Sequence, residues 1–206
     1  MLISNGILGL QVQQAEAVLP LFEATGAYLK GHFRLTSGLH SSEYLQSALV
    51  LRFPEHAEKL GVMLARKLKA LTEPVGIGLV AAPALGGLII GHEVARALQV
   101  PFIFTERDAT GGMLLRRGFH VDPGTNVVVV EDVITTGGST REVVDILKAL
   151  GANVLAAGSI MDRSNGRAET GVPRVALQTL EVVAYDPANC PLCRAGSDAI
   201  KPGSRT

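Results

Sequence analysis

The chain has 206 residues, of which 47% are hydrophobic and 18% charged, and its 19 basic residues balance its 19 acidic residues. This composition excludes an intrinsically disordered chain and a strongly basic protein that coats nucleic acid. The length fits one domain with a continuous core better than two domains, so we expect residues 1–206 to form a single domain.

The longest uncharged stretch, Val75 to Gly91, is shorter than the roughly 20 residues that span a bilayer, and Pro83 interrupts it. It predicts a buried strand, a turn and a helix instead. The N-terminus lacks a basic leader and a small-residue cleavage site. The two cysteines cannot form a disulfide framework. We therefore expect a cytoplasmic protein with no membrane segment.

The first third of the chain predicts two helices separated by an extended segment. Apolar residues recur at helical spacing between Leu8 and Phe22, although Pro20 should kink that helix. Gly31–Ser47 is rich in Ser, Gly and His and predicts a hairpin-like segment. Apolar positions between residues 57 and 71 predict a second, amphipathic helix that begins at Pro54.

After this helix, apolar runs alternate with helical patterns. Strands are expected at Ile77–Ala81, Phe102–Thr105, Val127–Glu131 and Val154–Met161, and helices at Gly87–Leu98 and Gly138–Leu150. Strands that are apolar almost throughout, with helices between them, are typical of a parallel sheet covered on both faces. The sequence therefore predicts an α/β fold that ends in a loose tail, residues 201–206.

One segment, VVVVEDVITTGGST (Val127–Thr140), combines features that bind a phosphorylated sugar. A buried strand delivers Glu131 and Asp132 to the carboxyl edge of the sheet, where ligands of α/β proteins bind. A loop of hydroxyl and glycine residues then enters a helix, and free N–H groups at a helix N-terminus solvate phosphate. The carboxylates are good acceptors for sugar hydroxyls.

Other phosphate-binding motifs do not fit. No GK[ST] sequence occurs, which excludes a Walker loop. Gly76–Ala81 fits a dinucleotide fingerprint in spacing, but it lies within a predicted strand and leads to Pro83 rather than opening a helix.

Val127–Thr140 resembles the phosphoribosyl-pyrophosphate (PRPP) signature of the type I phosphoribosyltransferases. Gly31–Leu45 resembles the N-terminal hood segment of the orotate phosphoribosyltransferases, and Met161–Ser164 (MDRS) resembles their DR element. The resemblance implies a largely parallel sheet flanked by helices, with a small hood. The hood would comprise about residues 1–50 and the C-terminal segment, and the core about 55–185.

The resemblance implies that the chain transfers the 5-phosphoribosyl group of PRPP to orotate, giving orotidine 5′-monophosphate and pyrophosphate in pyrimidine biosynthesis. It assigns the ribose hydroxyls to Glu131 and Asp132, which with Arg107 form the expected catalytic set. It assigns PRPP binding to Ala82, Pro83, Ala84, Leu85, Gly86, Glu131, Asp132, Val133, Ile134, Thr135, Thr136, Gly137, Gly138 and Ser139.

Within that set, Thr135–Ser139 would hold the 5′-phosphate. Ala82–Gly86 would hold the pyrophosphate through backbone N–H groups and a strained peptide. The resemblance assigns orotate binding to Ser37, Gly38, Thr135 and Arg163, with the Arg163 guanidinium pairing with the orotate carboxylate. It implies Mg²⁺ as cofactor, held mainly through PRPP and water without a direct protein ligand.

The chain departs from the family pattern at two places. Gly86 stands where many relatives carry a lysine, and Thr105–Gly118 lacks the lysines and histidine of their mobile catalytic loop. The cations available there are Arg107, Arg116 and Arg117. The resemblance implies a homodimer with shared active sites, in which one of these arginines reaches the neighbouring site.

Two other functions share the PRPP signature: a purine phosphoribosyltransferase of a salvage pathway, and a non-catalytic regulatory protein that binds PRPP. Ser37, Gly38 and Arg163 favour orotate over a purine. Zero net charge and the lack of a basic run argue against a regulator that binds nucleic acid.

Cys190-Pro-Leu-Cys193 has the spacing of half a zinc site. The five histidines show no paired metal spacing: His32, His40, His56, His92 and His120. Two free thiols in a turn, or a four-cysteine site across a dimer, are the alternatives at this stage. His40 lies in the expected hood, either as a substrate contact or as a solvated residue.

Overall fold

The computed structural model describes residues 18–35 and 37–202. Its helices are α1 (Val18–Ala24), α2 (Ser47–Leu51), α3 (Pro54–Thr72), α4 (Gly87–Leu98), α5 (Gly138–Ala149) and α6 (Pro191–Arg194), with a 3₁₀ turn η1 (Pro187–Asn189). Its strands are β1 (Tyr28–Arg34), β2 (His40–Leu45), β3 (Leu79–Pro83), β4 (Phe102–Arg107), β5 (Met113–Leu115), β6 (Asn126–Ile134), β7 (Asn153–Asp162), β8 (Arg174–Thr179) and β9 (Ala184–Tyr185).

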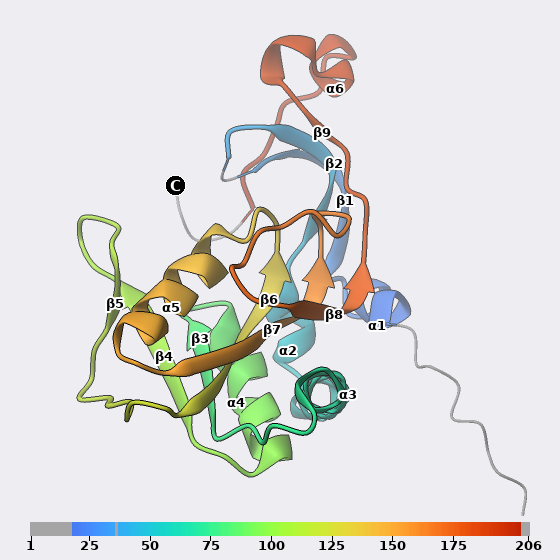
Figure 1. Ribbon diagram of the computed structural model, residues 1–206. Helices are drawn as coiled ribbons and strands as arrows, with labels where there is room; N and C mark the ends of the chain where they lie inside the picture. Colours follow the sequence, from blue (N-terminus) through green and yellow to red (C-terminus); the bar gives the residue numbers. More distant parts are fainter. Residues whose placement is uncertain (1–17, 36, 203–206) are drawn as a thin grey trace, which may run out of the picture.

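A six-stranded sheet in the order β5-β4-β3-β6-β7-β8 forms the core, and all its strands except β5 pair in parallel. Side chains alternate across β6. Val128 and Val130 pack with α3 and α4, whereas Val127 and Val129 pack with α5. Helices therefore cover both faces of the sheet, which confirms the predicted α/β class (Figure 1).

The hood is a separate three-stranded sheet in the order β1-β2-β9. It lies beyond the arrowheads of β6, β7 and β8, at the carboxyl edge of the core sheet (Figure 1). The predicted hairpin of residues 31–47 is confirmed as β1 and β2, which pair antiparallel. The N-terminal helix was predicted partly from Leu8, Val12 and Ala15, which lie outside the described residues; α1 buries Val18 and Phe22.

The predicted core elements are found with small changes at their ends, and Gly87–Leu98 matches α4 at both ends. β6 continues three residues beyond Glu131, so Asp132 lies within the strand. The strand predicted at Phe102–Thr105 does not end at Thr105, and the stretch after it is not a continuous loop. Instead β4 extends to Arg107 and turns back into β5, because the Asp108 carboxylate caps the turn by accepting the Gly112 N–H at 2.9 Å. Among the described residues, no helix combines the length and apolarity needed to cross a bilayer.

Candidate functional site

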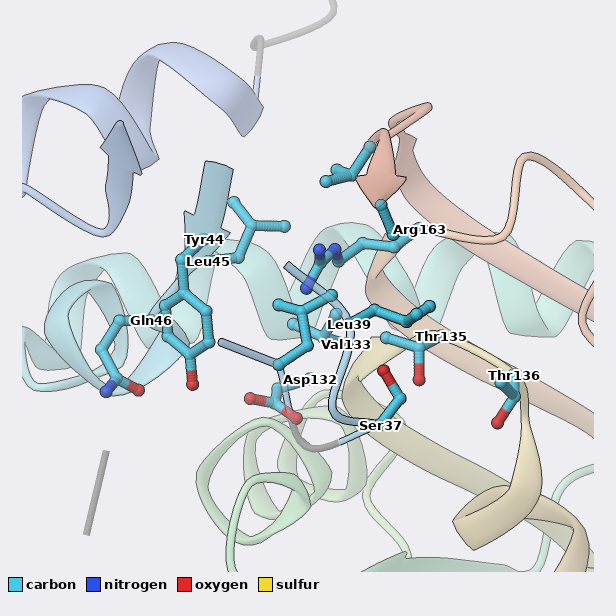
Figure 2. Close-up of a pocket in the computed structure, with 13 residues that line it drawn as sticks. Ser37, Leu39, Tyr44, Leu45, Gln46, Asp132, Val133, Thr135, Thr136 and Arg163 are labelled. Carbon is cyan, nitrogen blue, oxygen red and sulfur yellow. The ribbon is translucent and has the colours of Figure 1, made fainter. Parts of the chain in front are cut away.

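A cavity of about 520 Å³ lies between the hood and the carboxyl edge of the core sheet. Its lining residues come from both parts of the fold: Leu35, Ser37, Leu39, Tyr44, Leu45, Gln46, Asp132, Val133, Thr135, Thr136, Arg163, Val182 and Ala184. In Figure 2 the Arg163 guanidinium points inwards, Asp132 and Ser37 lie across from it, and Thr135 and Thr136 lie at one end. The cavity thus lies at the carboxyl edge of the sheet, where ligands of α/β proteins bind.

The loop between β6 and α5 has the geometry of an anion cradle. Gly137 has φ +87°, and a Cβ there would lie 3.0 Å from the Glu169 carbonyl oxygen, so the turn requires glycine. The helix begins at Gly138, and its first N–H groups lack intrahelical acceptors. The exposed hydroxyls of Thr135 and Thr136 precede it. These donors together can solvate a phosphate.

Glu131 faces the first turn of α5, where the Thr140 hydroxyl donates to its carboxylate. Burial raises the pKa of Glu131 to about 7, and the nearby Asp132 adds to the rise, while the bond from Thr140 and the charge of Arg107 oppose it. A ligand that donates hydrogen bonds to this carboxyl group would favour its ionised form and lower its pKa.

Asp132 approaches the turn after β3 closely. A Cβ built on Gly86 would lie 2.4 Å from Asp132 Oδ1, so the close approach requires glycine at position 86. Burial raises the pKa of the Asp132 carboxyl, and the hydrogen bond from the Val133 N–H opposes that rise. Glycine at position 86 is therefore matched to the position of this carboxylate.

The turn at Ala82–Gly86 divides into a buried and an open part. Ala82 and Pro83 are buried in β3, and the Ala84 N–H donates to the Thr105 carbonyl at 2.8 Å. The peptide bond between Ala84 and Leu85 is cis, and Leu85 is 77% exposed. Backbone N–H groups that could hold an anion therefore begin at Leu85 and continue into the first turn of α4.

Arg107 is one of the three arginines that the resemblance offers for the neighbouring site, and within its own chain its side chain lies beside the β6–α5 loop. Its guanidinium bonds both carboxylate oxygens of Glu142, at 2.9 and 3.1 Å, and lies 3.3 Å from Ser139 Oγ. The β4–β5 hairpin carries it there because β4 continues through residue 107. Arg117 forms an ion pair with Glu106 at 2.7 Å, and Arg116 is exposed.

Arg163 lies on the connection that follows β7, and its side chain enters the cavity. Its Nε atom is buried and has no hydrogen-bond partner in the described part of the chain. Burial lowers the pKa of the guanidinium, although Tyr44 and Glu43 oppose that shift. Burying part of a guanidinium without a partner is costly, so an anionic group of a ligand would stabilise it.

The neighbouring Asp162 holds this connection in place. Its carboxylate accepts the Ser164 N–H at 2.7 Å and Arg174 Nη1 at 2.5 Å. The side chain is almost fully buried. The MDRS segment therefore combines an anchoring aspartate with an arginine that faces the cavity.

Ser37 lines the cavity as predicted, whereas Gly38 does not belong to the described lining. Gly38 has φ +85° and its N–H donates to the Leu35 carbonyl, so it shapes the turn that presents Ser37. Tyr44, Val182 and Ala184 also line the cavity, and the sequence did not single them out. Val182 lies between β8 and β9 and Ala184 begins β9, and neither apolar side chain gives a chemical signal in the sequence.

Comparisons with known proteins agree on one family. The sequence model of the phosphoribosyl transferase domain matches residues 69–184. An orotate phosphoribosyltransferase of Pelotomaculum thermopropionicum is 52% identical over 190 residues, covering 92% of this chain and 97% of the relative. Further curated relatives at 50–51% identity carry the same name.

Solved structures show the same fold. An orotate phosphoribosyltransferase from Aeropyrum pernix is 27% identical, with a TM-score of 0.67 over 80% of this chain and 94% of its own. An adenine phosphoribosyltransferase superposes with a TM-score of 0.60 over 76% of this chain and 98% of its own. At 20% identity this second likeness shows the fold alone.

Proposed function

The chain belongs to the phosphoribosyl transferase family, and on that premise we propose how its residues divide the work. Its function is orotate phosphoribosyl transfer: the 5-phosphoribosyl group of PRPP passes to orotate, giving orotidine 5′-monophosphate and pyrophosphate. The observation that carries this function is Arg163, whose half-buried guanidinium enters the cavity and whose buried Nε is unpaired within residues 18–35 and 37–202.

Orotate is a pyrimidine that carries a carboxylate. A guanidinium binds a carboxylate through two parallel N–H donors, which adds geometric selectivity to the charge attraction. Adenine, guanine and uracil carry no such group, so they would leave Arg163 without an anion. The cavity therefore favours orotate over the purines of the alternative salvage function.

PRPP would lie along the carboxyl edge of the core sheet. Thr135–Ser139 would receive the 5′-phosphate at the N-terminus of α5, with the Arg107 guanidinium beside Ser139 supplying positive charge. Glu131 and Asp132 would accept hydrogen bonds from the ribose hydroxyls. The turn from Leu85 into α4 would hold the pyrophosphate. Replacing pyrophosphate at C1 of ribose develops positive charge on the sugar, which nearby carboxylates stabilise electrostatically.

Mg²⁺ fits this donor set, because Glu131 and Asp132 offer hard oxygen atoms beside the place proposed for the ribose and pyrophosphate. When bound, the ion would neutralise charge on the departing pyrophosphate. We propose that it is held mainly through PRPP and water.

We also propose a homodimer with shared active sites. Arg107 is committed to its own chain through Glu142, and Arg117 pairs with Glu106. Arg116 is exposed and makes no ion pair within residues 18–35 and 37–202. It is therefore the arginine of the hairpin that is free to reach a partner subunit's pyrophosphate.

The test of the function is the variant Arg163→Ala. Removing a charge-assisted pair in a partly buried pocket should raise the KM for orotate by about 10–100-fold, with a much smaller change in the KM for PRPP. Arg167→Ala is the matched control, because Arg167 is exposed, four residues away and outside the cavity lining. Equal orotate kinetics in both variants would refute the assignment of Arg163.

A further inference from the structure

Four side chains with metal-binding atoms meet in the hood, away from the cavity lining: His32, His40, Cys190 and Cys193. Their ligand atoms all lie within 4.8 Å of one another. We call them the Cys₂His₂ cluster. The two histidines come from the β1–β2 hairpin and the two cysteines from the C-terminal segment. The sequence therefore shows a metal-binding spacing only for the two cysteines.

The sulfur–nitrogen distances within the cluster match those of a zinc coordination shell. Zn–S bonds of about 2.3 Å and Zn–N bonds of about 2.0–2.1 Å place neighbouring ligand atoms of a tetrahedron about 3.3–3.8 Å apart. Cys190 Sγ and Cys193 Sγ lie 3.6 and 3.7 Å from His32 Nε2, and Cys193 Sγ lies 3.3 Å from His40 Nδ1. His32 Nε2 and His40 Nδ1 are 2.9 Å apart, a hydrogen-bond distance, so these two nitrogens would have to separate to about 3.3 Å to ligate one ion.

A second, independent observation concerns the other nitrogen of His32. His32 Nδ1 lies 2.9 Å from the Ser197 carbonyl oxygen, an arrangement in which Nδ1 carries the proton and donates it. Nε2 then carries a lone pair that faces the cluster. Histidines that ligate metals almost always donate their second N–H in this manner, to a carbonyl or a carboxylate.

Burial also favours a ligand. His32, His40 and Cys190 are 6%, 8% and 0% exposed, so three of the four polar groups lie away from water. Both cysteines are free thiols. Two thiols and two imidazoles offer one another few strong hydrogen bonds, because a thiol is a weak donor and a weak acceptor.

We propose that the Cys₂His₂ cluster binds one Zn²⁺ ion in a closed tetrahedral site. Two thiolates and two imidazoles form one of the usual ligand sets of structural zinc, and they fit Ca²⁺ and Mg²⁺ poorly because those ions prefer oxygen. Four protein ligands leave no open coordination position. The ion therefore has a structural role and takes no part in phosphoribosyl transfer.

The place of this zinc site links it to the base-binding wall of the cavity. His32 and His40 flank the β1–β2 connection, which contributes Leu35, Ser37 and Leu39 to the lining. The zinc ion would tie this connection to the C-terminal segment, whose Ile200 already bonds β1 through Arg34 N–H at 2.7 Å. Metal binding would therefore fix the hood over the cavity.

The test is metal content, measured on the untagged full chain. The protein is purified under reducing conditions, equilibrated with ZnSO₄, desalted and analysed by elemental mass spectrometry. We expect about one zinc per chain, and at least a tenfold loss in Cys193→Ser and in His40→Asn, because each removes a ligand. His92→Asn is the control. His92 is exposed on α4 and lies outside the cluster, so this variant should keep its zinc.

Zinc at trace level in the parent protein would overturn the proposal and leave a hydrogen-bonded cluster of thiols and imidazoles. So would equal zinc content in the parent and Cys193→Ser. Cobalt titration of the parent protein covers the case in which the variants do not fold. Intense visible bands of a tetrahedral thiolate–cobalt centre are expected, and the weak bands of octahedral cobalt would contradict the site. Neither readout depends on the proposed enzyme activity.

Discussion

The carboxyl group of Glu131 changes its charge near neutral pH, because burial raises its pKa to about 7. The ionised form is the stronger acceptor for a ribose hydroxyl, since hydrogen bonds to charged groups contribute about 1.5–3 kcal/mol. Thr140 and Arg107 lie close to this group and favour the ionised form. If Glu131 accepts a ribose hydroxyl as proposed, it couples PRPP binding to pH.

The kinetic consequence is a rise in kcat/KM for PRPP as pH increases through about 7. In Glu131→Gln this limb of the profile should disappear, and kcat/KM at pH 8 should fall by about 10–100-fold because a charged acceptor is lost. Steady-state rates across pH 5.5–9 measure both effects. An unchanged limb in the variant would show that another group titrates.

The stability consequence has the opposite sign. A carboxyl group whose pKa is raised in the folded state stabilises the folded protein fully below its unfolded pKa of 4.5. This stabilisation is lost as pH rises through about 7, where the buried group ionises. Glu131→Gln should therefore gain stability over the parent protein between pH 5 and pH 8, by up to about 2 kcal/mol. Urea unfolding at both pH values checks this, and a constant difference would contradict it.

At the scale of the elements, the β3–α4 turn and β6 are fitted to each other at one point. Gly86 leaves room for the Asp132 carboxylate, and any side chain at position 86 would displace it. The sequence alone gives no reason for glycine at position 86, because the reason, the Asp132 carboxylate, lies on another strand. Similarly, the β4–β5 hairpin brings Arg107 to its own chain's α5, a contact that no local pattern predicts.

Gly86→Ala tests this fit. The added Cβ would lie 2.4 Å from Asp132 Oδ1, so the carboxylate must move away from its position at the ribose site. We expect the KM for PRPP to rise by at least about tenfold, since small displacements at a site are costly. Gly76→Ala is the control, because a Cβ there meets nothing within 4 Å. Similar PRPP kinetics in both variants would contradict the proposed fit.

For the whole molecule, the sequence predicts the core more fully than the hood. Strands such as Val127–Val130 are apolar throughout, and helices such as α4 carry a clear periodicity, so local patterns determine them. The edge strand β8 mixes polar and apolar residues and was not predicted. The Cys₂His₂ cluster was missed because its histidines and cysteines lie about 150 residues apart, and only the folded hood brings them together.

Shared active sites can be tested by mixing subunits. Arg116→Ala and Asp132→Asn should each lose most activity alone. If Arg116 acts on the partner's site, a mixed dimer keeps one intact site and regains about half the activity of the parent dimer. Arg107→Ala mixed with Asp132→Asn should not recover, because Arg107 serves its own chain. No recovery in the first mixture, despite verified exchange, would refute the role of Arg116.

The central claim is that this cavity selects a pyrimidine bearing a carboxylate. The most direct measurement incubates the protein with PRPP, Mg²⁺ and one base at a time, and follows consumption of orotate, uracil, adenine, guanine and xanthine. The account predicts that orotate is consumed with release of pyrophosphate, and that uracil, which lacks the carboxylate, reacts at least about 100-fold more slowly. Preferential consumption of a purine, or equal rates for orotate and uracil, would contradict it.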